Sequence, residues 1–275
     1  MFLSKIPFIK DPFYLSYTSI SDFLKCPRSF YLKNVYRDPK TNFRLQLASP
    51  YLSLGSTVHD SIAWYLTLRK KPDFPEVIKT FKNYWLKFHG RKGGFSSLDE
   101  ETVFGQRGIS MLENFTKNVG VLERLVKPLS FPKVHLVENM ILLGNIDYVG
   151  EREDGSLHII DFKTGIKDED SALQLYIYAL LAESNYLKDV SKISFWYLDR
   201  DACPKEAVLD PLDTTYQWLK EQALEIKQAL DSNRWQCLGK GRCDCAAYES
   251  IIKGKGEFMF TDYKFKKDIY YLKRS

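Results

Sequence analysis

Two aspartates and one lysine stand on two neighbouring strand-like stretches of the chain. Asp147 lies within the apolar stretch 141–149, and Asp161 and Lys163 stand at the end of the next one, which begins at residue 157. Aspartate oxygens are ligands for Mg²⁺ or Mn²⁺, which keep further positions for water and a substrate phosphate. Such an ion lowers the pKa of its water and neutralises charge on phosphoryl oxygens. With a lysine ammonium that holds the water or stabilises charge, the carboxylates predict metal-assisted phosphodiester hydrolysis.

Whether these side chains meet depends on the register of a hairpin. Side chains alternate along a strand, so Asp161 and Lys163 share one face, and Asp-Gly at 154–155 favours a tight turn before them. A two-residue Asp-Gly loop would pair 147 with 162 and place Asp147 on the wrong face. A three-residue loop over 153–155, with Gly155 left-handed, pairs 147 with 161. We predict this register, or another of the same parity.

A helix is predicted over residues 171–185, where Asp170 or Ser171 can cap the first free N–H groups. Gln174 and Tyr178 are four residues apart and therefore share one face of this helix.

Three motifs in this region, GNID (144–147), IIDFK (159–163) and QLYIY (174–178), resemble the PD-(D/E)XK nucleases of the RecB type. Relatives of that type include the nuclease domains of RecB and AddB helicase–nucleases and the CRISPR-associated RecB-like exonucleases. The resemblance implies an α/β, restriction-endonuclease-like fold, in which a central mixed sheet is flanked by helices within one nuclease domain, residues 1–275. It implies that Asp147 and Asp161 hold the cation and that Lys163 positions the attacking water. Gln174 and Tyr178 would orient the lysine or the scissile phosphate.

A histidine upstream adds a possible third ligand. On its residue type alone, His59 is more often structural, but the G-x-x-x-H start at 55–59 resembles the family motif that presents an imidazole to the metal. A neutral imidazole suits Mn²⁺ better than Mg²⁺. We expect a helix over 54–70 here, capped by Ser56 or Thr57.

Four cysteines form a second set: Cys26, and Cys237, Cys243 and Cys245 within nine residues. Four thiolates can hold a [4Fe–4S] cluster or a zinc ion. The S-x-x-x-x-L-x-C-P-x-x-F/Y segment around Cys26 resembles the iron–sulfur members of the family, which implies a cluster clasping segments 17–37 and 235–246. The C-x5-C-x-C spacing departs from the family pattern, nearer C-x2-C-x5-C, so zinc and free reduced thiols stay open. Cys203 matches no pattern.

The remaining elements are read from periodicity. Pro27 should break or restart a helix in 17–37, residues 60–130 should form a helical insertion, and 213–230 an amphipathic helix capped by Asp213 or Thr214. We expect the first strand at 133–140, with Glu138 as an auxiliary carboxylate, and a further central strand at 192–200. The lysine- and aromatic-rich tail suits an edge strand protected by its lysines or a grip on single strands. Five basic residues of the insertion could face DNA phosphates or only solvent: Lys79, Lys82, Lys87, Arg91 and Lys92.

Composition adds modest limits. The net charge of +5 is compatible with a nucleic-acid partner without requiring one. The first residues lack a secretory apolar core, and nothing approaches the roughly 18 apolar residues of a membrane span, so we expect a cytoplasmic protein. The resemblance implies a DNA exonuclease acting on single strands or duplex ends in repair, recombination or CRISPR adaptation, with a helicase or CRISPR adaptation protein as partner. The alternatives are an inactive nuclease-like module and a zinc-clasped DNA-binding protein.

Overall fold

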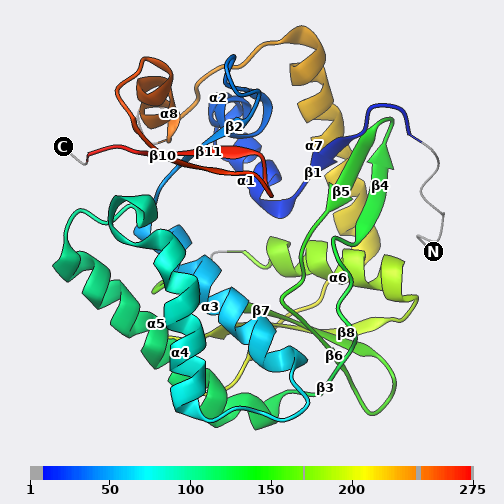
Figure 1. Ribbon diagram of the computed structural model, residues 1–275. Helices are drawn as coiled ribbons and strands as arrows, with labels where there is room; N and C mark the ends of the chain where they lie inside the picture. The colour runs from blue at the N-terminus through cyan, green and yellow to red at the C-terminus, as the bar shows by residue number, and fades with distance from the viewer. Residues whose placement is uncertain (1–8, 170, 240–242, 274–275) are drawn as a thin grey trace. The chain divides into compact units, whose positions relative to one another are not determined.

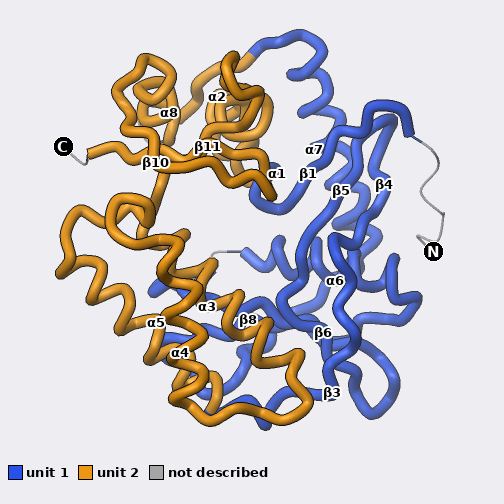
Figure 2. The backbone as a smooth tube through the Cα atoms, in the orientation of Figure 1, with its two compact units in different colours: residues 1–20, 117–234 blue, residues 21–116, 235–275 orange. Residues whose placement is uncertain are grey.

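The computed structural model describes residues 9–169, 171–239 and 243–273 of the 275-residue chain. The chain separates into two compact units, coloured in Figure 2. Unit 1 comprises residues 1–20 and 117–234, and unit 2 comprises residues 21–116 and 235–275. The chain therefore leaves unit 2 after residue 116, builds most of unit 1, and returns to unit 2 at residue 235.

The main sheet of unit 1 has five strands in the order β3-β6-β7-β8-β9. Strand β7 pairs parallel with β8 and antiparallel with β6, while β3 and β9 add antiparallel edges. Helix α6 (Leu173–Tyr186) connects β7 to β8, as a parallel pair requires (Figure 1). This mixed sheet with its helices confirms the predicted α/β class. The strands are β3 (Arg124–Leu125), β6 (Tyr148–Glu151), β7 (Leu157–Lys163), β8 (Val190–Tyr197) and β9 (Lys205–Ala207).

The two faces of β7 have different surroundings because its side chains alternate. Leu157 and Ile159 lie in one buried cluster with Leu175 and Ala179 of α6. Strand β7 is buried along almost its whole length, which explains why it reads as a continuous apolar run. The polar residues that end this strand on the α6 side are therefore presented next to the first turns of α6.

A smaller sheet of unit 1 has the order β1-β5-β4, with β1 (Phe13–Leu15) parallel to β5 (Met140–Leu143). Strand β4 (Lys133–Val137) pairs antiparallel with β5, and helix α7 (Leu212–Ser232) contacts β4. Two expectations are corrected here. The segment at 133–140 is not the first strand, since β1, β2 and β3 precede it. Helix α7 begins after Pro211, its N-cap residue, and Asp213 and Thr214 do not cap it because both lie inside its first turn.

Unit 2 is largely helical and carries one three-stranded sheet, β10-β11-β2. Pro27 restarts a helix as predicted, and α2 (Pro27–Phe30) continues into a π-helical turn (Tyr31–Val35). The tail forms a hairpin with β10 (Glu257–Asp262) at the sheet edge, in agreement with the edge-strand prediction. The other elements of this part are α1 (Tyr17–Lys25), which begins in unit 1, β2 (Arg44–Leu47), α3 (Pro50–Thr67), α4 (Phe74–Trp85), α5 (Leu98–Asn118), which ends in unit 1, α8 (Cys245–Ile252) and β11 (Lys267–Tyr271).

The start of α3 was predicted too late. The helix begins with Ser49 and Pro50 rather than at Ser56 or Thr57. Thr57 is fully buried inside the helix, and its hydroxyl donates to the Ser53 carbonyl oxygen over 2.8 Å. Proline at the first helical position is the start signal that matters here. In the described part of the chain, every helix is too short or too polar to cross a bilayer.

Candidate active site

The β6–β7 hairpin has the predicted register. Tyr148 lies opposite Ile160 and Glu151 opposite Leu157, while the Arg152 amide N–H donates to the Ser156 carbonyl oxygen over 2.9 Å. The loop therefore comprises residues 153–155, and Gly155 is left-handed with φ +83°. Asp147, which directly precedes β6, consequently continues the register toward Asp161. The prediction that rested on loop length and parity is confirmed.

Both carboxylates are held by defined donors. The Phe162 amide N–H donates to Asp147 Oδ2 over 3.0 Å, which fixes this carboxylate beside the end of β7. Asp161 is 2 % exposed and receives a hydrogen bond of 2.8 Å from Gln174 Nε2. A buried charge is tolerated only when partners of this kind compensate its desolvation. Two acidic side chains thus stand at one end of the sheet.

Lys163 lies at the centre of the polar contacts. Its Nζ is 3.0 Å from Asp161 Oδ2 and 3.1 Å from Glu169 Oε1, and it donates to Gln174 Oε1 over 2.6 Å. Burial alone would lower the pKa of Lys163, but the charges and hydrogen bonds of Asp161 and Glu169 outweigh it and raise the pKa. The ammonium is therefore charged at neutral pH. It can hold a water molecule or stabilise phosphoryl charge, but it is not poised to remove a proton.

Glu169 was not singled out from the sequence. It lies in the connection between β7 and α6, where its amide N–H donates to the Tyr197 hydroxyl over 2.9 Å. The only available signal was the acidic run after Lys163, and such runs are usually solvated. The auxiliary carboxylate predicted instead, Glu138, occupies the β4–β5 turn and pairs with Lys227 at 3.4 Å.

Helix α6 completes the set, as its predicted face implied. The N-cap residue of α6 is Ala172 rather than Ser171, and it makes no side-chain cap. Ser171 accepts a hydrogen bond from the Leu173 amide over 3.1 Å just before the helix, and Asp170 lies outside the described residues. Gln174 Nε2 also donates to the Tyr178 hydroxyl at 3.0 Å. Burial raises the pKa of Tyr178 strongly, and the charges of Asp161 and Asp147 add to the shift. The phenol therefore stays protonated, and both carboxylates lie within electrostatic reach of it.

Gly144 of the GNID segment permits this packing. A Cβ atom built on Gly144 would lie 2.8 Å from Leu181 Cδ1 and 3.3 Å from Tyr178 Cε1. A side chain there would displace the ends of the Leu181 and Tyr178 side chains. We name Asp147, Asp161, Lys163, Glu169, Gln174 and Tyr178 together the carboxylate–lysine site.

His59 belongs to unit 2, where it is half-buried on α3. Its neighbour Asp60 has its pKa raised by burial, against the opposing charges of Lys87, His59 and Lys264. The role of His59 as a metal ligand stays a prediction.

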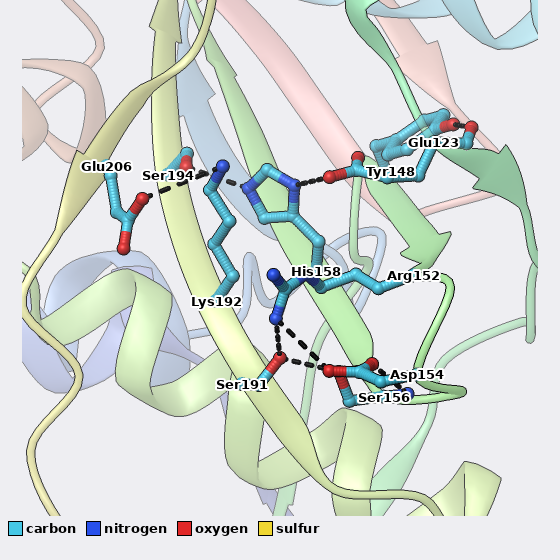
Figure 3. Close-up of polar contacts among 10 residues, drawn as sticks. All are labelled: Glu123, Tyr148, Arg152, Asp154, Ser156, His158, Ser191, Lys192, Ser194 and Glu206. Atoms are coloured by element: carbon cyan, nitrogen blue, oxygen red, sulfur yellow. Dashed lines mark hydrogen bonds and ion pairs between the residues drawn. The ribbon is translucent and has the colours of Figure 1, made fainter.

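A second polar network surrounds His158 on the other face of β7 (Figure 3). His158 Nδ1 lies 2.8 Å from Glu123 Oε1, and Nε2 lies 2.7 Å from Ser194 Oγ. This order of groups imitates a nucleophilic triad, yet Ser194 is completely buried and His158 is 2 % exposed. No substrate carbonyl can reach that hydroxyl, so the network is structural. Burial lowers the pKa of His158 in spite of Glu123, which keeps the ring neutral.

The four predicted cysteines meet in unit 2. Their sulfur atoms all lie within 4.8 Å of one another, although Cys26 and Cys237 are 211 positions apart in the chain. The Sγ–Sγ distance is 3.6 Å for Cys26–Cys245, 3.5 Å for Cys237–Cys243 and 3.9 Å for Cys237–Cys245. Cys203 is exposed and lies in unit 1. We name the four converging residues the thiolate site.

The backbone around Cys26 favours a thiolate. Burial alone would raise the pKa of Cys26, but backbone N–H groups of Ser29, Leu238 and Gly239 together with Cys245 lower the pKa to about 6. Gly239 is needed for this approach, since a Cβ atom there would lie 2.6 Å from Cys243 Sγ. Such a set of sulfurs can bind a metal ion or a cluster.

The fold and the carboxylate–lysine site together define the class of metal-dependent phosphodiesterases built on a mixed sheet. In agreement with this, residues 14–250 match the family model of the PD-(D/E)XK nuclease superfamily. The chain belongs to that superfamily, whose members are metal-dependent nucleases acting on nucleic acid. No curated protein matches the chain.

Proposed function

We propose that this chain is a DNA nuclease that uses Mg²⁺ or Mn²⁺ held by Asp147 and Asp161. The observation that supports this best is the contact set around Lys163, in which a buried ammonium is held against Asp161, Glu169 and Gln174. Two aspartates leave most positions of a hard divalent ion to water and substrate phosphate. The superfamily match spans both units, so we propose that both belong to one nuclease.

Each residue of the site would have a separate task. The ion, when bound, supplies activated water and neutralises phosphoryl charge. Lys163, kept protonated by its two acidic neighbours, positions the attacking water and stabilises the negative charge that develops on the phosphate. Gln174 orients both Asp161 and Lys163, because its amide bonds to each of them. Tyr178 offers a protonated hydroxyl beside the carboxylates. We propose His59 as a further ligand, which would favour Mn²⁺.

The test is cleavage of end-labelled DNA with Mg²⁺, with Mn²⁺ and with EDTA. We expect Lys163→Ala to lower the rate at least about 10²-fold, the usual cost of removing one preorganised electrostatic group, with unchanged circular dichroism. Lys167→Ala, an exposed lysine four residues further on, is the matched control and should cleave normally. Full activity of Lys163→Ala, or activity in EDTA, would overturn the proposed mechanism. No cleavage by the wild type with either Mg²⁺ or Mn²⁺ would favour an inactive nuclease-like module.

The finer assignment is an exonuclease that starts on single strands or duplex ends, in repair, recombination or CRISPR adaptation beside a helicase or an adaptation protein. The family membership is its only support. Oligonucleotides labelled at the 5′ or the 3′ end, a circular substrate and an RNA strand distinguish polarity, end dependence and sugar preference in one experiment.

We further propose that the thiolate site holds one tetrahedral ion of the zinc class rather than the [4Fe–4S] cluster expected from the resemblance. Four sulfurs at about 2.3 Å from one zinc ion stand about 3.8 Å apart. Four of the sulfur pairs lie 3.5–3.9 Å apart, and all of the sulfurs lie within 4.8 Å of one another. In a cubane each thiolate binds a different iron, which spreads the sulfurs to roughly 6 Å.

Metal analysis and a visible spectrum of protein purified without oxygen test this assignment. One equivalent of zinc and no visible absorption are expected. Four iron atoms with a broad visible band would support the [4Fe–4S] cluster instead. The absence of both metals would support four reduced thiols.

A further inference from the structure

Unit 2 carries a groove that the carboxylate–lysine site does not use. Two adjoining hollows of about 230 Å³ and 340 Å³ share Lys87, Lys92, Phe260 and Asp262 in their walls. The first is also lined by Lys267, Phe265 and Ser56, and the second by Tyr263. The groove thus runs between the 3-10 turns after α4, the first half of α3 and the tail hairpin β10–β11. We name it the lysine–aromatic groove.

Lys267 is a half-buried cation at the start of β11. Its Nζ donates to Gln46 Oε1 over 2.7 Å, and in the part of the chain that the structure describes no carboxylate lies within ion-pair distance of it. Burial lowers the pKa of Lys267, and the charge of Arg44 lowers it further, while Asp262 opposes the shift. An ammonium that is partly desolvated in the wall of a groove, and whose only hydrogen-bond acceptor in the described part of the chain is a neutral amide, can bind an external anion.

The other charges of the groove leave an excess of cations. Asp262 is the acidic residue in its walls, and this carboxylate already accepts from Lys87 Nζ at 3.3 Å and from the Phe265 amide at 3.2 Å. Lys92 is exposed at the rim. Asp60, one turn along α3 from Ser56, lies within the influence of Lys87 and Lys264. An anion entering the groove therefore meets more ammonium groups than carboxylates.

Large aromatic rings stand exposed beside these ammonium groups. Tyr263 is 78 % exposed and Phe265 is 43 % exposed. Rings next to cations offer a face to a nucleobase and a charge to its phosphate. Bases that are paired in a duplex cannot stack on such rings, whereas those of a single strand can.

We propose that the lysine–aromatic groove binds single-stranded DNA, with Lys267, Lys87 and Lys92 on phosphates and Tyr263 and Phe265 stacked on bases. The inference deepens the proposed nuclease function, on which it rests, by naming the form of substrate that unit 2 holds. It also gives the tail a role: the hairpin is an edge of the sheet and a wall of the groove at once.

The test is fluorescence anisotropy of a labelled oligothymidine with the full-length protein in EDTA, so that no cleavage occurs. We expect Lys267→Gln and Lys92→Gln each to weaken binding several-fold and to reduce the slope of log K against log salt by about 0.7, the value for one phosphate contact on a single strand. Tyr263→Ala should weaken binding roughly 5-fold to 100-fold without changing that slope, because stacking is worth about 1–3 kcal/mol per base.

Two controls lie in the same unit outside the groove. Phe258→Ala removes a ring that is 52 % exposed on β10, and Lys253→Gln removes an exposed charge after α8. Both should bind like the wild type. Lys92 is exposed, so we expect its substitution to leave the fold intact even if that of Lys267 does not.

The outcomes separate this inference from the nuclease proposal. Wild-type binding by Lys92→Gln and Tyr263→Ala would overturn the groove assignment, as would equal binding of a duplex or of an oligoglutamate peptide. If Lys163→Ala still cleaves DNA, the catalytic proposal fails while the binding result stands. If Lys163→Ala loses cleavage but the groove variants bind normally, the groove proposal alone fails.

Discussion

Gln174 links Asp161, Lys163 and Tyr178 within the carboxylate–lysine site. Its amide nitrogen donates to Asp161 and to Tyr178, and its amide oxygen accepts from Lys163. Replacement by glutamate keeps the size and the bond to Lys163 but removes the donor and places a negative charge against Asp161. A nearby like charge raises the pKa of a carboxylic acid.

We therefore expect Gln174→Glu to lower cleavage about 10-fold to 100-fold, the usual cost of disturbing a group that orients metal ligands. The acid limb of the pH–rate profile should move to higher pH, and more Mg²⁺ should be needed for half-maximal rate. Gln228→Glu, the same change on the exposed side of α7, is the control. A lower rate with an unmoved pH profile would mean that Gln174 acts only through packing.

His158 yields a prediction about stability against pH. Its pKa in the folded chain is lowered from the ordinary 6.5 by burial, so below pH 6.5 the unfolded chain binds a proton that the folded chain refuses. The histidine therefore contributes its full stability above pH 6.5, and this contribution is lost as the pH falls below that value. His158→Gln cannot titrate, so its midpoint of urea unfolding should decline less between pH 7 and pH 5. Parallel declines would contradict the assignment.

At the scale of elements, the β6–β7 turn sets the register on which the site depends. Gly155 has φ +83°, and a Cβ atom added there would have no neighbouring atom within 4 Å. The cost of an alanine at this position is therefore backbone strain without a steric clash. We expect Gly155→Ala to cost about 1–2 kcal/mol and to lower the melting temperature by roughly 3–5 °C. Gly155→Asn should be milder, because asparagine tolerates this conformation.

Gly120→Ala is the matched control, since Gly120 is equally open and has no positive φ. Cleavage by Gly155→Ala should persist below its melting temperature. Loss of cleavage in protein that is still folded would show that the strain is relieved by a register slip, which would turn Asp147 away from Asp161.

Local rules were sufficient for this hairpin and for α6. The Asp-Gly pair predicted the loop, and the parity of the register placed Asp147 on the same face as Asp161. The four-residue spacing placed Gln174 and Tyr178 on one face of the helix. The prediction for the apolar stretch 141–149 was less complete. The stretch covers parts of two strands, β5 and β6, and Asp147 lies in the connection between them. Hydrophobicity alone does not show that break, because both strands are buried and neither alternates with polar residues.

Features set by distant contacts escaped the sequence. Glu169 reaches Lys163 from an irregular connection, where no periodicity reports which way a side chain points. The start of α3 was misplaced because Thr57 looks like a cap, whereas its hydroxyl donates to a carbonyl group of its own helix. Only the cysteines indicated from the sequence that the chain returns to unit 2 at residue 235. The presence of four cysteines does not predict the distances between their sulfur atoms.

At the scale of the whole molecule, the thiolate site joins the two passes of the chain through unit 2. Cys26 and Cys245 are buried in one apolar cluster with Leu32, Tyr248 and Ile251. A metal bound there closes a loop of 211 positions, for which the chain entropy of the unfolded state is worth about 5 kcal/mol at most. The ion should therefore stabilise unit 2 without taking part in the chemistry of unit 1.

We expect Cys26→Ser, or removal of the ion with a zinc chelator, to lower the melting temperature by several degrees. Hydrogen exchange should speed up first in α2, α8 and β2, which surround the sulfurs, and later in β7 and α6. Cys203→Ser, which removes an exposed thiol outside the thiolate site, should leave both measurements unchanged. If exchange instead rises equally in β7 and α6, the two units unfold as one, because loss of a local clasp would speed exchange in its own neighbours before the sheet of unit 1.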